Sequence, residues 1–279
     1  MTDAAGGQYD SPHDLYEVVV VRHGTREARR SDVFLNYAQY GEPDGPFVLD
    51  YYLWVVRSRT RTVLVDTGFA RGAAEARGRQ VLVDPAEAYR RLGVDTDSHL
   101  SVVVTHGHYD HIGNLDLFPN ATVIASAAEV EFWSSPVSRR PLLGHFTEAE
   151  ELATLERIDA KGRLCRFSGT TEPAPGVVVT EVGGHTPGQC MVTVPTSEGT
   201  VLLTSDAVHF AEELNRDMPF IAVTDLPAMY LGLQRVRDLV AAGEVDHVLT
   251  GHTAGELDRL EPWKDDLAGI AGVIGRLER

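Results

Sequence analysis

The chain has 279 residues, of which 41 are acidic and 25 are basic, so its formal net charge is −16 at pH 7. Hydrophobic residues make up 43% of the sequence and charged residues 24%, which is typical of a globular protein. The negative charge disfavours nucleic-acid partners, and no stretch approaches the ~18 apolar residues of a membrane span. There are two cysteines and no CxxC motif, and residues 1–14 lack the features of a signal peptide, so we expect a cytoplasmic protein.

The first half of the sequence alternates predicted strands with predicted helices. We expect a flexible leader at residues 1–14, followed by a single domain over 15–279. Apolar and β-branched runs predict strands at 16–22, 47–57, 62–66, 100–105 and 121–125. Asp-Pro at the start of 84–92 and Ser at the start of 126–134 predict two capped helices. Residues 70–80 are compatible with a loop or a short helix.

The second half continues the same mixture. Strand patterns occur at 164–167, 177–182, 189–194, 200–204 and 246–249. Residues 226–242 have the apolar spacing of an amphipathic helix. The charged, irregular segment 135–163 is predicted to form a helical insertion or lid. Strands interspersed with helices in both halves favour a layered α/β domain over a helix bundle or an all-β barrel.

Segment 102–113 carries the strongest functional signal. Four residues with metal-binding side chains, His106, His108, Asp110 and His111, follow a predicted buried strand within six positions. Imidazole nitrogens and a carboxylate suit Zn²⁺ or another divalent first-row metal. A polar turn with chance histidines is the alternative, but four such residues at this spacing favour a metal site.

Three further residues of the same kind come later in the chain. His185, Asp206 and His252 each lie just beyond a predicted strand. Functional sites in layered α/β folds gather on the loops at strand ends, so these residues are candidates for the same site.

At this point the sequence resembles the metallo-β-lactamase superfamily, whose HxHxDH signature is present as HGHYDH, with the later His, Asp and His in the expected order. The resemblance implies a four-layer αββα sandwich with two metal ions, most commonly Zn²⁺. One metal would be held by His106, His108 and His185, the second by Asp110, His111 and His252, and both by Asp206. A hydroxide bridging the two ions would attack a substrate carbonyl, with Asp110 carrying a proton.

Within the superfamily, the sequence is most similar to the N-acyl homoserine lactonase family. The similar stretches are 51–69, 202–220 and the long segment 114–183. The resemblance implies a lactone or ester as small-molecule partner, quorum quenching as the role, and a possible homodimer. Where those lactonases have a substrate-contacting Tyr, this chain has His209, which could donate a hydrogen bond to an oxyanion. Phe69 could line an acyl pocket or belong to the core.

Several alternatives stay open at this point. The substrate could be another ester, thioester or lactone, because His209 departs from the lactonase pattern. A mononuclear iron persulfide dioxygenase shares the ligand motif and would hold one iron. A non-catalytic binding module is also possible, although the complete ligand set argues against it. The other histidines are predicted to be surface or core residues: His13, His23, His99, His145 and His247.

Overall fold

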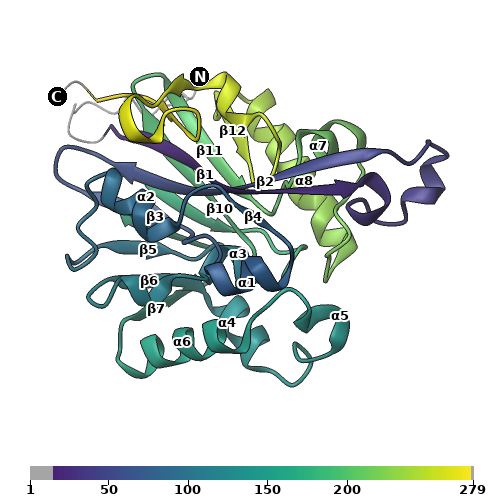
Figure 1. Ribbon diagram of the computed structural model, residues 1–279, viewed down its shortest axis with the longest axis horizontal. Coiled ribbons are helices and arrows are strands. Elements are labelled where there is room, and N and C mark those ends of the chain that lie inside the picture. Colours follow the sequence, from purple (N-terminus) through teal and green to yellow (C-terminus); the bar gives the residue numbers. More distant parts are fainter. Residues whose placement is uncertain (1–14, 278–279) are drawn as a thin grey trace, which may run out of the picture.

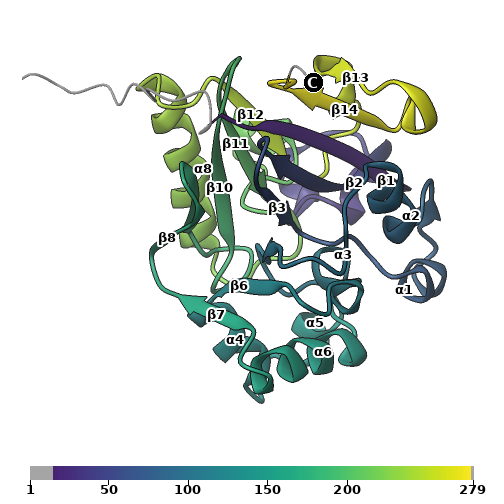
Figure 2. The same cartoon turned by 90° about the vertical axis from the view of Figure 1, so that its left-hand side faces the viewer.

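The structure is a computed structural model that describes residues 15–277. Two β-sheets face each other, and helices cover their outer faces, as Figures 1 and 2 show. This arrangement confirms the predicted αββα sandwich. The predicted leader at 1–14 lies outside the described residues.

The larger sheet has nine strands in the order β13-β14-β1-β2-β3-β5-β6-β7, with β4 paired to β1. Its members are β1 (Glu17–Arg29), β2 (Pro46–Arg57), β3 (Thr62–Val65), β4 (Gln80–Val81), β5 (Ser101–Val103), β6 (Thr122–Ser126), β7 (Leu164–Phe167), β13 (Glu261–Pro262) and β14 (Ala271–Ile274). Strands β3, β5, β6 and β7 run parallel to one another, so the ends of β3 and β5 lie at one edge.

The smaller sheet has the order β12-β11-β10-β9-β8. Its members are β8 (Thr170–Ala174), β9 (Val177–Glu181), β10 (Cys190–Thr196), β11 (Gly199–Ser205) and β12 (His247–Thr250). Strands β11 and β12 are parallel, and the Cys190 backbone N–H at the start of β10 donates to the Thr105 carbonyl beyond β5 at 3.0 Å. That hydrogen bond joins the two sheets at the edge where the candidate metal ligands lie.

Alternation along the strands builds the core in two layers. Val18 and Val20 of β1 pack between the two sheets, whereas Val19 and Val21 pack beneath the outer helices. Both faces of the strand are therefore buried, which explains its continuous apolar sequence. Beyond Arg22 a bulge lets β1 continue to Arg29 in antiparallel pairing with β2. The predicted strand at 16–22 was thus too short.

The helices are α1 (Arg71–Ala76), α2 (Pro85–Arg91), α3 (Tyr109–Ile112), α4 (Ala127–Ser134), α5 (Pro141–Gly144), α6 (Ala149–Ala160), α7 (Ala211–Arg216) and α8 (Leu226–Ala241). The predicted caps are present: Asp84 accepts from the Ala86 N–H, and Ser126 accepts from the Ala128 N–H. Helix α8 buries its apolar face against the outside of the smaller sheet. No helix within the described residues combines the length and the apolar character that crossing a bilayer requires.

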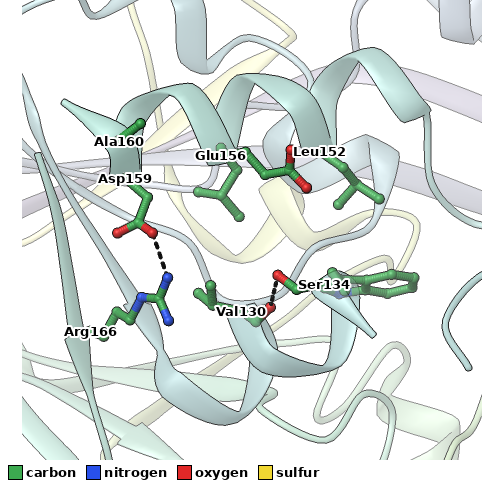
Figure 3. Close-up of a pocket in the computed structure, with 9 residues that line it drawn as sticks. Val130, Ser134, Leu152, Glu156, Asp159, Ala160 and Arg166 are labelled. Atoms are coloured by element: carbon green, nitrogen blue, oxygen red, sulfur yellow. Dashed lines mark hydrogen bonds and ion pairs between the residues drawn. The ribbon is translucent and has the colours of Figure 1, made fainter. Parts of the chain in front are cut away.

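Segment 135–163 contains α5 and α6, which lie below the larger sheet in Figure 1. Figure 3 shows how α6 is tied to its neighbours: Asp159 forms an ion pair with Arg166 of β7, across a small cavity of about 140 Å³ that Val130 of α4 also lines. Segment 135–163 is therefore anchored at the α6 end, while α5 extends toward the candidate site.

Candidate metal centre

The seven predicted ligands converge although they come from four separate segments of the chain. His106 and His108 follow β5, and Asp110 and His111 lie on the short helix α3. His185 follows β9, Asp206 follows β11, and His252 follows β12. All seven side chains are buried.

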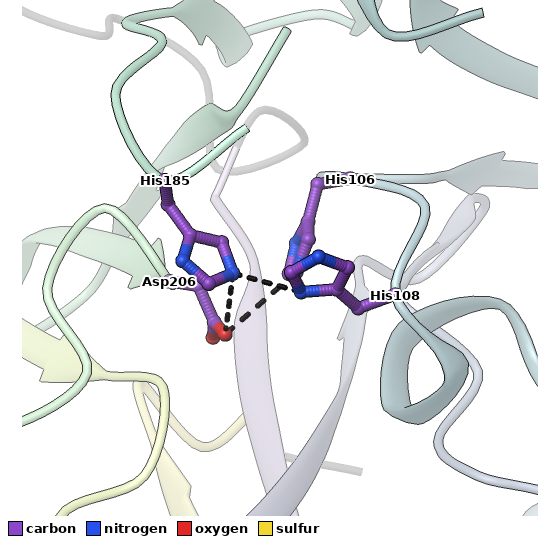
Figure 4. Close-up of side chains that lie close together, drawn as sticks. All are labelled: His106, His108, His185 and Asp206. Atoms are coloured by element: carbon purple, nitrogen blue, oxygen red, sulfur yellow. Dashed lines mark hydrogen bonds and ion pairs between the residues drawn. The ribbon is translucent and has the colours of Figure 1, made fainter. Parts of the chain in front are cut away.

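Their donor atoms form two groups. His106, His108, His185 and Asp206 each offer an atom within 4.8 Å of the others. Figure 4 shows these four side chains pointing toward one another. Asp110, His111 and His252 form the second group on the same criterion. The two groups contain the residues that the sequence resemblance assigned to two ions, with Asp206 in the first group. That they bind two metal ions stays a prediction.

The carboxylate of Asp206 lies between the two groups. Its Oδ2 is 3.4 Å from His185 Nε2 and 3.7 Å from His106 Nε2. Its Oδ1 is 3.1 Å from His252 Nε2 and 3.4 Å from His111 Nε2. Oδ2 also lies 3.3 Å from His252 Nε2. The carboxylate as a whole therefore contacts nitrogens of both groups, as a ligand shared by two ions must.

The site contains polar atoms that the protein does not satisfy. Within residues 15–277, His106 Nε2, His111 Nε2 and Asp206 Oδ1 are buried without a hydrogen-bond partner. Burial and the neighbouring imidazoles lower the pKa of His106 and His108 well below the ordinary value, so both rings are neutral, which is the form that binds a metal. Burial opposes the charged form of His111 as well, but the carboxylates around it raise its pKa. A divalent ion would satisfy the unpaired buried atoms, which are costly otherwise, so these residues fit a metal.

Hydrogen bonds on the far side of the rings fix their orientation. His185 Nδ1 lies 2.7 Å from the Ala222 carbonyl, and His252 Nδ1 lies 2.8 Å from the Asp50 carbonyl. His111 Nδ1 lies 2.7 Å from Asp66 Oδ2. These contacts direct each Nε2 toward the site, as carbonyl and carboxylate partners do for metal-binding histidines.

A buried carboxylate that the sequence did not single out, Glu129 of α4, holds two of the ligand loops together. It accepts hydrogen bonds from the Gly107 N–H at 2.7 Å, the Trp133 Nε1–H at 2.6 Å and the Gly188 N–H at 2.9 Å. Gly107 lies between the first two predicted histidine ligands and Gly188 follows the third. No sequence motif marks Glu129, because its partners come from distant loops.

His209 lies beside the centre and is fully buried. Its Nε2 is 3.1 Å from Asp206 Oδ2, and its Nδ1 is 3.2 Å from Glu213 Oε2. Burial opposes the charged form, but these two carboxylates outweigh it and raise the pKa of His209 to about 9. Glu213 also accepts from the Phe220 N–H at 2.5 Å, a role that no sequence motif indicated.

The other residues considered from the sequence have varied surroundings. Phe69 is fully buried and packs edge-on against His23, with ring centroids 4.2 Å apart. Phe69 belongs to an aromatic cluster with Tyr51. It does not line the large cavity that opens next to His108 and His185. His145 is exposed and does line that cavity. His23 is buried, His247 is half-buried, and His99 is exposed, whereas His13 is outside the described residues.

A cavity of about 1050 Å³ opens beside the centre, with His108 and His185 in its wall. Three segments surround it: 26–35, 133–146 and 220–224. The middle one includes α5, so part of the predicted insertion forms a wall of the cavity. The lining is mainly apolar, which suits a ligand that carries a hydrocarbon chain.

Comparisons with known proteins agree with this architecture. The family model described as "Metallo-beta-lactamase superfamily" matches residues 48–252. An N-acyl homoserine lactonase from Bacillus sp is 28% identical over 222 residues, covering 74% of this chain and 82% of the relative.

Two solved structures share the fold. A quorum-quenching N-acyl homoserine lactone lactonase superposes with a TM-score of 0.72 at 22% identity, over 86% of this chain and 93% of its own. A dizinc quorum-quenching lactonase, solved with a product, gives a TM-score of 0.68 at 18% identity, over 86% and 88% of the two chains.

Proposed function

The chain belongs to the metallo-beta-lactamase superfamily, and from that premise we propose that it is a dinuclear zinc hydrolase that opens a lactone ring. The proposed substrate class is the N-acyl homoserine lactones. The observation that carries the proposal is the position of Asp206, whose carboxylate lies between two groups of buried candidate ligands and is within 3.4 Å of His185 Nε2 in one and 3.1 Å of His252 Nε2 in the other. The similarity to an N-acyl homoserine lactonase over most of both chains supports the substrate class.

The residues that would hold the ions are those of the two groups. His106, His108 and His185 would hold one ion, Asp110, His111 and His252 the other, and Asp206 both. Divalent ions at such a site supply Lewis acidity, which polarises a carbonyl and lowers the pKa of water. Hydrolysis adds water across the ester C–O bond and yields a carboxylic acid and an alcohol.

The protein's own groups orient the ligands and move the proton. Asp110 Oδ2 lies 3.7 Å from His252 Nε2, at the rim of the second group, and is the carboxylate proposed to pass a proton to the leaving alcohol oxygen. His209 supports Asp206 from behind through the 3.1 Å contact to Oδ2. That His209 also donates to the substrate oxyanion stays a prediction, since the ring has no exposed surface.

The apolar cavity supports the acyl part of the proposal. Phe146 of the insertion and Phe220 beyond α7 both line it. The ring of Phe146 lies 5.3 Å from that of His108, and Phe220 stacks on His209 at 4.1 Å. A hydrocarbon chain placed between these rings would lead directly to the first group of ligands.

The test combines metal analysis with acid release. Purified protein is expected to carry two equivalents of zinc per chain and to release acid from N-decanoyl homoserine lactone in a pH-stat. Asp110→Asn should abolish the release, whereas Asp116→Asn, a change at an exposed position six residues away, should not. No release from protein carrying two zinc ions would refute the substrate class. One iron per chain with oxygen consumption would refute the dinuclear hydrolase itself.

A further inference from the structure

The cavity beside the centre has a charge opposite to that of the chain. Three arginines, Arg26, Arg79 and Arg140, line it together with one acidic residue, Asp32. The chain as a whole has a formal charge of −16. Positive charge gathered at one cavity of an acidic protein raises the local concentration of anions and speeds their entry.

Within the described part of the chain, Arg26 and Arg79 have no carboxylate partner, whereas the arginines next to them in sequence do. Close to Arg26 in sequence, Arg29 pairs with Asp44 and Arg30 with Glu212. Within residues 15–277, by contrast, none of Arg26, Arg79 and Arg140 has a carboxylate oxygen within 4.0 Å.

The same contrast holds around Arg79. Its neighbour Arg77 pairs with Glu148 at 2.7 Å. Arg79 is half-buried, yet it is left without an ion pair in the part of the chain that the structure describes. The Asp110 carboxylate attracts Arg79 only from beyond ion-pair distance. A partly buried guanidinium without a direct ion pair suits an anionic ligand.

Arg79 is held in place by neutral groups. Its Nε–H donates to the Tyr109 hydroxyl at 3.1 Å, and its Nη1–H donates to the Arg77 carbonyl at 2.6 Å. Among the described residues, Nη2 has no hydrogen-bond acceptor. Tyr109 immediately precedes Asp110, and its hydroxyl donates to that of Tyr51 at 3.4 Å. Arg79 is therefore positioned next to the second group of ligands, with donor capacity left over.

We propose that the natural substrate carries a carboxylate, separate from the ester that is cleaved, and that Arg79 binds this carboxylate with help from Arg26 and Arg140. The inference rests on the proposed hydrolase function and narrows its substrate class. The apolar walls hold a hydrocarbon segment, and the guanidinium groups hold the acid. An acyl chain ending in a carboxylate fits both features.

A kinetic comparison tests the proposal on the zinc-loaded protein. N-decanoyl homoserine lactone is compared with the same lactone whose acyl chain ends in a carboxylate. The wild type is expected to show a kcat/KM about tenfold higher for the acidic substrate, as one charge-assisted hydrogen bond gives. Arg79→Gln should bring the ratio of the two kcat/KM values close to one. Arg139→Gln removes the same charge from an exposed residue outside the cavity and should keep the ratio.

The outcomes separate the two proposals. Equal kcat/KM for both lactones in the wild type would overturn the carboxylate inference and leave the lactonase proposal standing. If neither lactone is hydrolysed, the lactonase proposal fails, and calorimetry with monomethyl decanedioate, which carries one carboxylate, and dimethyl decanedioate, which carries none, decides the inference. Binding of the monomethyl ester about tenfold tighter, with the difference lost in Arg79→Gln, supports it; equal affinities overturn it.

Discussion

Replacing Glu129 by glutamine tests whether one buried carboxylate holds both histidine loops of the first ligand group. The carboxylate accepts from Gly107, Trp133 and Gly188, and its side chain is buried. Glutamine has the same shape, but one of its two terminal atoms is a donor. In either orientation of the amide, its NH₂ group points at an N–H that the carboxylate oxygen had accepted from, so at least one buried N–H loses its acceptor.

The expected loss of stability follows from the number of N–H groups left without an acceptor. In the cheaper orientation the amide oxygen keeps Gly107 and Trp133, and the Gly188 N–H is left unpaired. One unsatisfied buried donor costs about 1–3 kcal/mol of the free energy of unfolding. For a chain of this size that corresponds to a fall in Tm of about 2–10 °C. Because Gly188 follows His185, we also expect zinc affinity to fall by about 10- to 100-fold, as when groups behind metal ligands are removed.

Two measurements check the reasoning. Thermal unfolding is recorded with zinc and with a chelator, and zinc affinity is measured by competition with a chromophoric chelator. Glu131→Gln, at an exposed position on the same helix, is the matched control and should change neither quantity. A normal Tm for Glu129→Gln would show that the three hydrogen bonds do not hold the loops. A lower Tm with unchanged zinc affinity would show that Glu129 supports the fold without positioning the ligands.

Two further changes probe packing and pH. A Cβ at Gly188 would lie 2.3 Å from the Glu129 backbone nitrogen, so Gly188→Ala should destabilise the protein by about 1–3 kcal/mol. The control is Gly72→Ala, in open space on α1, which should be neutral or stabilise the protein by up to about 1 kcal/mol. Urea unfolding of the two variants checks this, and equal stability would refute the clash. Burial, with repulsion from the carboxylates of Glu148 and Asp110, raises the pKa of Glu151 from 4.5 to about 8. The folded state then binds the Glu151 proton more tightly than the unfolded chain does. The contribution of protonated Glu151 to the free energy of unfolding is therefore full below pH 4.5 and is lost as the pH rises to about 8. Glu151→Gln should therefore raise stability above pH 8 by up to about 5 kcal/mol and change little at about pH 4, and a Tm difference that is the same at both pH values would contradict the assignment.

The parts of the fold that sequence predicted well are those where local pattern and burial agree. The strand expected at 164–167 is β7, and that expected at 47–57 is β2 with one more residue. The outer half of β1 was missed because its residues are polar and their pairing with β2 depends on the bulge after Arg22. Strand β14 was missed because Ala271–Ile274 is too short to be recognised without its partner β1.

The candidate metal ligands could be predicted because each is a local signal: a residue that binds metals, placed just after a strand. Two of the residues that support them, Glu129 and Glu213, leave no such signal. Glu129 accepts from amides 22 and 59 positions away in sequence, and its neighbours on α4 are ordinary helix residues. Glu213 serves His209 from the first turn of α7, where an acidic residue is expected in any helix. Only the folded chain shows which of the 41 acidic residues are buried and hydrogen-bonded to the segments that carry the candidate ligands.

Specificity is harder to predict than chemistry for the same physical reason. The ligands sit at the edge that the two sheets share, and strand order alone brings them together. The cavity walls come from segments 26–35, 133–146 and 220–224, which meet only through tertiary packing. Only the structure shows that Arg77 forms an ion pair with Glu148 whereas Arg79, two positions away, forms none with the described residues. The sequence therefore predicts the reaction class, whereas the proposed choice of substrate rests on arginines whose lack of ion pairs, within the described residues, only the fold reveals.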